Sequence, residues 1–199
     1  NLMNTKGNFS RRIEKKILIQ KMPINKVEIE IMKHNFFPIF KERIVKSLYY
    51  DTTNFNCYKD SFEGIVPRKK YRIRSYDNQQ DFQLEVKSQE LDGRYKKNTK
   101  VEGYSKYVFD KDYGNLEQKL YVMYMRKYYS NNFLRLTLDW GINFQKLNGK
   151  NLKLRDYLVV ELKPITEFSI QGEYLSNNIF NIPEMSFSKY EQAVESLFI

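Results

Sequence analysis

Basic and acidic side chains recur at every second position along several short stretches of this sequence. In RKKYRIRSY the pattern joins Arg72 to Arg74, and in DFQLEVKSQ it joins Glu85 to Lys87. Successive side chains of an extended chain point to opposite faces, so each such pair shares one face of a strand. Guanidinium and ammonium groups bind phosphate oxygens, and carboxylates bind divalent cations. These residue types favour a site for a metal-bound phosphate compound.

One solvated face per strand is the simplest explanation of such alternation, although a surface accepts Ser, Thr, Asn and Gln as readily as charges. Long basic side chains recur together with carboxylates on several stretches, which indicates that the charged faces enclose something. The rows contain the positive residues Lys16, Arg72, Arg74, Lys87, Arg126, Arg135 and Lys163, and the negative residues Glu14, Glu85, Asp139 and Glu161. Seven positive charges against four negative charges leave an excess of three, which suits a strongly anionic guest. The carboxylates fit beside it if a divalent cation lies between them and phosphate oxygens.

Composition limits the classes of protein to which the chain can belong. Its 199 residues are enough for one substantial domain, and we expect a single domain over residues 1–199. Hydrophobic residues make up 41% and aromatic residues 16%, which excludes a disordered chain. The formal net charge of +10 implies an anionic partner, and the single cysteine, Cys57, excludes an internal disulfide.

Localisation can be predicted only from what the sequence lacks. No apolar run approaches the ~20 residues of a membrane span, and the first residues lack the layout of a signal peptide. A reducing compartment is the simpler expectation for a chain with one cysteine. We therefore expect a cytoplasmic protein, or the cytosol-facing domain of a larger assembly.

Strand patterns dominate the elements that must position these charges. Val, Ile, Leu, Phe and Tyr alternate with polar residues in the stretches 46–52, 69–76, 81–89, 121–129, 132–140 and 156–164, each of which predicts a strand. Residues 11–20 fit either a strand or the start of a helix. A helix is expected over 23–34 with Asn25 as N-cap, and a short helical turn over 114–120. Ser188 and Glu191 form a capping box that starts an amphipathic C-terminal helix.

The expected fold is β-rich α+β, with an eight-stranded antiparallel β-barrel whose charged faces point inward. Helices would cover its apolar outer face, and a barrel of this size can hold one ligand. Such an arrangement places the ionic rows around an enclosed tunnel.

The order of short motifs resembles a known family. RIEKK, SLYYDT, YRIRSY, LEVKS, YMRKYY, LRLTLD, VVELK and SFSKY follow one another as in the VTC domain, from about residue 11 to residue 195. That domain is the polyphosphate polymerase module of the vacuolar transporter chaperone complex, and it belongs to the triphosphate tunnel (CYTH-like) metalloenzymes. The resemblance implies a tunnel in which basic residues hold triphosphate or polyphosphate beside Mn²⁺ or Mg²⁺.

The resemblance also implies roles for individual residues. The groups expected to hold the reacting phosphates are Arg72, Arg74, Lys87, Arg126 and Arg135. Further substrate-binding candidates are Lys16, Lys97, Lys100, Lys163 and Lys189, and one more basic residue is expected among Lys59, Arg68 and Lys70. Glu161 matches the metal-binding carboxylate, and Glu14 and Glu85 are the other metal candidates in the inward rows.

The function that follows is metal-dependent transfer of the γ-phosphoryl group of ATP to a polyphosphate chain. Water as acceptor would make the same site a triphosphatase, and a module that only binds polyphosphate is a third possibility. A nucleic-acid-binding barrel would also be basic and aromatic, but it has little use for paired carboxylates, so no nucleic acid is expected. Oligomeric state stays open.

Overall fold

A computed structural model describes residues 8–10, 14–77, 79–149, 151–153, 157–165 and 185–199. Strands make up most of it, and all the strand pairs are antiparallel. The elements are β1 (Asn8–Ser10), β2 (Lys15–Gln20), α1 (Ile24–Lys33), β3 (Phe37–Asp51), α2 (Asn56–Phe62), β4 (Arg68–Tyr76), β5 (Phe82–Glu90), β6 (Gly93–Val101), β7 (Tyr107–Asp110), β8 (Gly114–Ser130), β9 (Leu134–Lys146), β10 (Asn151–Lys153), β11 (Tyr157–Pro164) and α4 (Lys189–Phe198).

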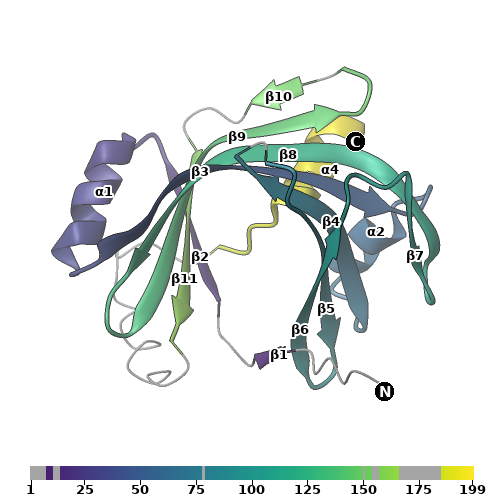
Figure 1. The fold of residues 1–199 in the computed structure, drawn as a ribbon, viewed down its shortest axis with the longest axis horizontal. Coiled ribbons are helices and arrows are strands. Elements are labelled where there is room, and N and C mark those ends of the chain that lie inside the picture. Colours follow the sequence, from purple (N-terminus) through teal and green to yellow (C-terminus); the bar gives the residue numbers. More distant parts are fainter. Residues whose placement is uncertain (1–7, 11–13, 78, 150, 154–156, 166–184) are drawn as a thin grey trace.

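A single sheet contains all the strands, in the order β1-β6-β5-β4-β3-β8-β9-β11-β2, with β7 added beside β8 and β10 beside β9. Figure 1 shows this sheet curled around the centre of the molecule. The β-rich antiparallel architecture is confirmed, but no strand pairing in the described part of the chain joins β6 to β2, so the barrel is curled rather than closed.

The first residues of the chain bring the two edges of the sheet towards each other. Ser10 ends β1 on the β6 edge, and Lys15 begins β2 on the β11 edge. Because an extended chain spans at most ~3.6 Å per residue, these two ends lie within about 18 Å. The curl is therefore imposed by connectivity as well as by strand twist.

Apolar side chains cover the outer face of the sheet in two clusters. On one side Val27 and Ile31 of α1 pack on Leu136, Val160 and other residues of β2, β9 and β11. On the other side Cys57 of α2 packs in a cluster with residues of β3, β4, β7 and β8. Figure 1 shows α1 and α2 on opposite sides of the curled sheet. The expected apolar outer face with helices against it is confirmed.

The C-terminal helix departs from the expected role of an outer cover. Tyr190, Ala193 and Leu197 of α4 pack with Tyr49 and Val122, which lie on the same face of the sheet as the charged rows. The helix therefore fills part of the concave side. Ser188 caps it as predicted, since its side chain accepts a hydrogen bond from the Glu191 amide.

A β-bulge in β9 divides the inner face into a charged part and an apolar part. Gly141 has φ +60°, and the register between β8 and β9 shifts by one residue at this point. Asp139 and Ile142, three residues apart, consequently face the same side. Asp139 contacts the cationic groups of the inner face, whereas Ile142 packs in the cluster with α4.

Two local predictions need correction. The helical turn expected over 114–120 is wrong, because these residues belong to β8 and pair with β7 and β3 on its two sides. Strand pairing on both edges outweighs a weak helical preference. The helix expected over 23–34 is present as α1, but its N-cap is Pro23 rather than Asn25. No helix in the described ranges has the length and apolar character needed to cross a membrane.

Candidate phosphate-binding cavity

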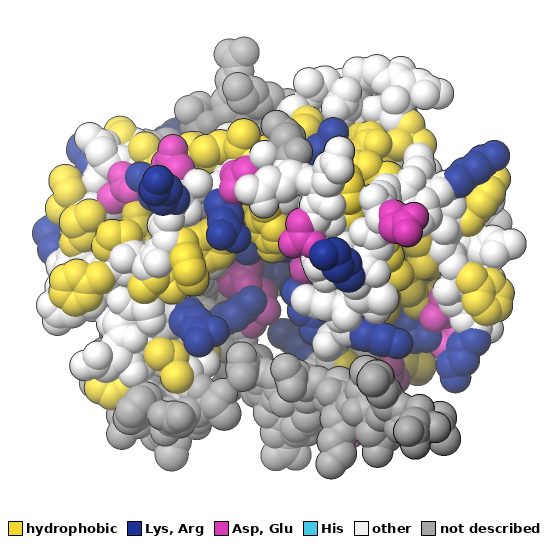
Figure 2. All heavy atoms as spheres, viewed as in Figure 1, with side chains coloured by type: hydrophobic (Ala, Val, Ile, Leu, Met, Phe, Trp, Pro, Cys, Tyr) yellow, Lys and Arg dark blue, Asp and Glu magenta, His cyan; other side chains and the backbone are white. Residues whose placement is uncertain are grey.

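The inner face of the sheet and the start of α4 enclose a cavity of about 250 Å³. Figure 2 shows a hollow at the centre of the molecule with Lys and Arg side chains gathered around it. Among the described residues, the lining has two acidic side chains, Glu85 and Glu161, and nine basic ones: Lys16, Lys70, Arg72, Arg74, Lys87, Lys96, Arg126, Lys163 and Lys189. Five tyrosines complete most of the wall: Tyr49, Tyr76, Tyr124, Tyr128 and Tyr190.

One wall of the cavity centres on Glu85, a buried carboxylate on β5. Arg72 donates from Nε to its Oε2 at 2.7 Å, Lys96 donates from Nζ to its Oε1 at 2.9 Å, and an Arg74 guanidinium nitrogen lies 3.7 Å away. Burial alone would raise the pKa of Glu85, but these three cations hold it well below its ordinary value. The wall therefore keeps a fixed negative charge that orders three positive groups.

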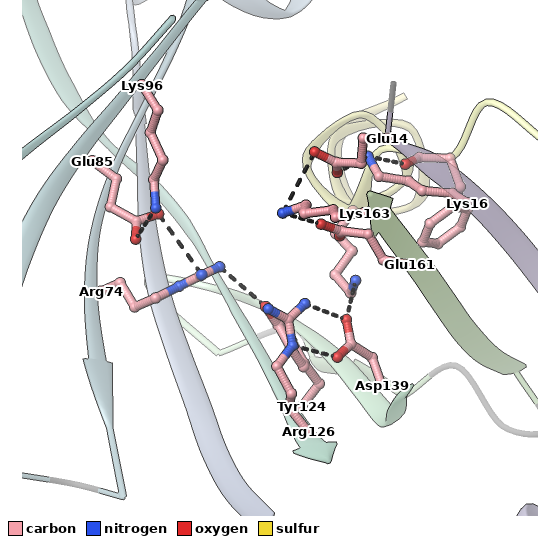
Figure 3. A network of polar contacts seen from close by, with 12 residues as sticks. Glu14, Lys16, Arg74, Glu85, Lys96, Tyr124, Arg126, Asp139, Glu161 and Lys163 are labelled. Atoms are coloured by element: carbon pink, nitrogen blue, oxygen red, sulfur yellow. Dashed lines mark hydrogen bonds and ion pairs between the residues drawn. The ribbon is translucent and has the colours of Figure 1, made fainter. Parts of the chain in front are cut away.

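Arg74 is the most enclosed cation of that wall, with 4% of its surface exposed. Its Nε donates to the Ser47 hydroxyl and its Nη2 to the Tyr124 hydroxyl, both at 3.0 Å. Neutral oxygen acceptors orient the guanidinium, and its ion pair with Glu85 is, at 3.7 Å, longer than those of Arg72 and Lys96. It remains available for an anion in the cavity (Figure 3).

The facing wall contains a second ion cluster. Arg126 donates to both oxygens of the fully buried Asp139, at 2.6 and 2.7 Å, and Lys189 of α4 donates to the same carboxylate at 2.6 Å. Burial would raise the pKa of Asp139, and the two cations lower it. The cluster joins β8, β9 and the start of α4, and it explains how the C-terminal helix delivers a lysine to the cavity.

Glu14 and Glu161 share one ammonium group. The Lys163 Nζ lies 2.5 Å from a Glu161 oxygen and 3.6 Å from a Glu14 oxygen, and Lys16 lies 3.6 Å from Glu14. Burial would raise the pKa of Glu161, but Lys163, Arg126, Lys87 and Lys16 hold it well below its usual range. Figure 3 shows both carboxylates on the side of the cavity opposite Glu85.

These surroundings decide which carboxylates suit a divalent cation. Mg²⁺ is commonly bound by one or two carboxylates together with phosphate oxygens and water. Glu14 and Glu161 converge on a single cation, Lys163, and fit that description. Glu85 does not, because its two oxygens are occupied by Arg72 and Lys96. In the part of the chain that the structure describes, no group of three or more His, Cys, Asp or Glu could hold a metal ion.

Lys87 differs from the other basic residues of the lining. Among the described residues it has no hydrogen-bond or ion-pair partner, whereas each of the other eight contacts an oxygen acceptor. Burial and the nearby Arg72 lower the pKa of Lys87 to about 7, against the opposing influence of Glu14 and Glu161. An unpaired amine in a basic cavity is well placed to bind an anion that enters it.

A family model described as the VTC domain matches residues 11–110 of the chain. The chain belongs to the VTC domain family. No curated protein sequence matches it significantly.

Solved structures share the fold of this VTC domain. A candidate adenylate cyclase from Bacillus halodurans has a TM-score of 0.59 at 14% identity, covering 94% of this chain and 98% of its own. A Pyrococcus horikoshii protein has a TM-score of 0.55 at 15% identity, covering 92% and 99%. HpAC1 from Hippeastrum, whose description states a dominant triphosphatase activity, has a TM-score of 0.53 at 16% identity, covering 94% and 97%. At such identities the similarity establishes the fold alone.

Most of the residues expected from the sequence meet in the cavity of the VTC domain. Its lining includes Lys16, Arg72, Arg74, Lys87, Arg126, Lys163, Lys189, Glu85 and Glu161. Glu14 is not part of the lining but contacts Lys16 and Lys163. Of the alternatives Lys59, Arg68 and Lys70, it is Lys70 that lines the cavity, and it donates to Glu191 at 2.6 Å. Arg68 instead donates to the carbonyls of Gly64 and Ile65.

Three expected residues lie elsewhere. Arg135 is exposed and is not among the lining residues, although its register partner, Lys163, is. Lys97 pairs in register with Val86, which faces outward, and the exposed Lys100 lies 4.0 Å from Asp81. We therefore leave these three out of the proposed site.

Lys96 and the lining tyrosines escaped the sequence analysis. Lys96 pairs in register with Lys87 and so shares its face. The sequence of β6, GRYKKNTKV, is polar on both faces and gives no apolar row to mark which lysine points inward. The sequence alone favours packing roles for Tyr49 and Tyr128. The fold shows that both also line the cavity.

The neighbouring lysines of β6 provide a matched test of this placement. We expect Lys96→Ala to weaken the binding of tripolyphosphate about 3- to 10-fold, because a partly exposed ammonium in the cavity is lost. Lys97→Ala removes the same charge from the opposite face and should leave the Kd within about twofold. Titration calorimetry of both variants checks this, and equal losses would mean that only the overall charge matters.

Proposed function

We propose that this VTC domain binds triphosphate groups in the cavity and transfers the γ-phosphoryl group of ATP to a polyphosphate chain. The observation that carries the proposal is the meeting of nine basic side chains around a cavity with two acidic ones. Phosphoryl transfer depends chiefly on positioning and on neutralising the charge of the phosphate oxygens. Basic groups on facing walls would serve both purposes, although Glu85, Asp139 and Glu161 already pair with several of them.

Individual residues of the site would have distinct roles. Arg74 and Arg126, each held by hydrogen bonds, would orient the triphosphate from the two walls. Lys87, which lacks a partner among the described residues, would form its ion pair with the substrate. Glu14 and Glu161 would hold Mg²⁺ or Mn²⁺. A cation at that position would withdraw charge from the phosphate oxygens.

The two lining carboxylates are weak bases for activating water as the acceptor. Water must lose a proton before or during attack, whereas the terminal phosphate of a chain is already anionic near neutral pH. Both lining carboxylates, which could accept such a proton, are engaged by basic groups and held ionised with lowered pKa values. Hydrolysis of triphosphate on the same site is the second candidate, and binding without turnover is the third.

Product analysis separates these functions. The protein is incubated with ATP and Mn²⁺, and long-chain polyphosphate and orthophosphate are both measured. Chain product supports the transferase, orthophosphate alone supports a triphosphatase, and neither product leaves only binding. A thermal-shift comparison of tripolyphosphate with single-stranded oligonucleotide accompanies it, and stabilisation by the oligonucleotide alone would overturn the proposal.

The pH dependence of binding should identify Lys87. A bound phosphate raises the pKa of this amine from about 7, so that binding takes up a proton above neutral pH. We therefore expect the affinity for tripolyphosphate to fall between about pH 7 and pH 9, with a slope approaching tenfold per pH unit from this group. Calorimetry across this range measures the slope.

Lys87→Met is the control for that titration. The variant retains the titration of the ligand itself, so the difference between the two profiles belongs to the amine. If the two profiles run parallel, Lys87 does not titrate against the bound anion.

A further inference from the structure

The inner face continues beyond two tyrosines of the cavity wall to Phe40 and Arg43, which are not lining residues. Two β-bulges in β3 shift its register against β8, so that Phe40 lies opposite Tyr128 and Arg43 opposite Arg126. Tyr128 and Arg126 line the cavity, and the bulges therefore aim Phe40 and Arg43 at the same face. We call Phe40, Arg43, Tyr76 and Tyr128 the aromatic rim.

Ring contacts hold the aromatic rim together. Phe40 meets Tyr128 edge to face, with ring centroids 5.8 Å apart at 87°. The Arg43 guanidinium lies 5.9 Å from the Phe40 ring centroid and 5.7 Å from that of Tyr76. Phe40 is nevertheless 61% exposed, which leaves much of a large aromatic ring facing solvent beside a charged cavity. Its free surface is well suited to stacking on a planar group.

The electrostatics of the rim favour an anionic ligand that carries such a group. Arg43 and Arg126 are direct cross-strand partners, an unfavourable pairing of like charges. Arg126 is neutralised by Asp139, whereas Arg43 has, among the described residues, a single long ion pair, to Asp77 at 3.9 Å. Arg43 thus extends the positive potential of the cavity onto the rim.

Strand geometry sets the distance between the two regions. Tyr76 follows Arg74 by two residues on β4, and Tyr128 follows Arg126 by two residues on β8. Each rim tyrosine therefore lies about 7 Å further along its strand than the arginine expected to hold phosphate. That spacing is comparable with the span of a ribose.

We propose that the aromatic rim binds the nucleobase of a nucleoside triphosphate whose phosphates occupy the basic cavity. The inference rests on the proposed function and adds how its nucleotide donor is held, with the base stacked at one end of the cavity. Stacking on Phe40 is tolerant of base identity, since every base presents a π face. The rim therefore selects nucleotides as a class without selecting one base.

Calorimetry with two ligands tests the proposal. ATP and tripolyphosphate are titrated into the wild-type chain, into Phe40→Ala and into Phe109→Ala. The last is the control, which removes another largely exposed ring from the remote strand β7. We expect Phe40→Ala to weaken ATP binding about fivefold or more while tripolyphosphate binding stays within about twofold. Phe109→Ala should change neither.

The outcomes separate this inference from the function on which it rests. If Phe40→Ala leaves ATP binding unchanged, or weakens both ligands equally, the rim does not bind a base, and the phosphate cavity is unaffected by that result. If the wild-type chain binds neither ligand, the proposed function itself is overturned. Because Phe40 is largely exposed, the variant is expected to fold, which a melting curve verifies.

Discussion

Glu161→Gln is expected to reduce metal-dependent turnover by at least about a hundredfold while leaving metal-free triphosphate binding intact. Glu161 is 8% exposed and shares Lys163 with Glu14, the arrangement that best fits a divalent cation. Gln keeps the shape of the side chain and removes its negative charge. In EDTA the variant should bind tripolyphosphate at least as tightly as the wild type, because a like charge has left the cavity.

The measurements are turnover of ATP with Mn²⁺ and calorimetry with tripolyphosphate in EDTA. Glu42→Gln is the matched control, since Glu42 is half exposed and its ion-pair partner among the described residues, Lys127, lies 3.8 Å away on the outside of the sheet. Undiminished turnover in Glu161→Gln would remove this residue from the cation site. Loss of metal-free binding would instead assign it a structural role.

Arg74→Ala should cause the largest loss of triphosphate affinity, about a hundredfold or more. Arg74 is almost fully buried, its hydrogen bonds go to the hydroxyls of Ser47 and Tyr124, and its ion pair with Glu85 is long, at 3.7 Å. A charge-assisted contact in such surroundings is much stronger than one at the surface. Calorimetry gives the affinity, and a thermal melt shows whether the fold survives.

Two further variants complete the Arg74 test. Arg74→Lys keeps the charge but not the paired donors, and should recover part of the affinity. Arg135→Ala removes an arginine that the sequence also predicted, from an exposed position outside the cavity lining, and should change the Kd by no more than about twofold. A loss as large as that of Arg74→Ala would mean that the anion extends to that end of β9.

On strands that carry a regular apolar row, alternation was sufficient to predict which face the charges occupy. Arg72 and Arg74, like Glu161 and Lys163, lie two residues apart on regular strands, and all four face the cavity. Apolar neighbours such as Ile73 and Leu162 fill the outer clusters and fix the orientation of each strand. A one-residue slip would bury the charges and expose these side chains, so the register follows from hydrophobicity.

How far along each strand the cavity extends could not be predicted in the same way. Arg135 occupies the correct face of β9 but lies beyond the cavity, because alternation carries no information on how far the ligand extends. The bulge at Gly141 inserts one extra residue into β9, so the residues beyond it face the side opposite to the one that strict alternation predicts. The sequence pattern does not show where along the strand this insertion lies. Placement of α4 on the concave side depends on packing between residues more than sixty positions apart, such as Tyr190 and Val122.

The position of Lys163 has a thermodynamic consequence. Its ammonium lies between Glu14 and Glu161, where a divalent cation would otherwise be attracted. A divalent cation that displaced this ammonium would free Lys163 to pair with a nearby phosphate. The cation and the phosphate should therefore bind with positive cooperativity. By linkage the coupling is reciprocal: whatever factor the cation adds to phosphate affinity, phosphate adds to cation affinity. Nucleotide and metal would thus enter as an interdependent pair.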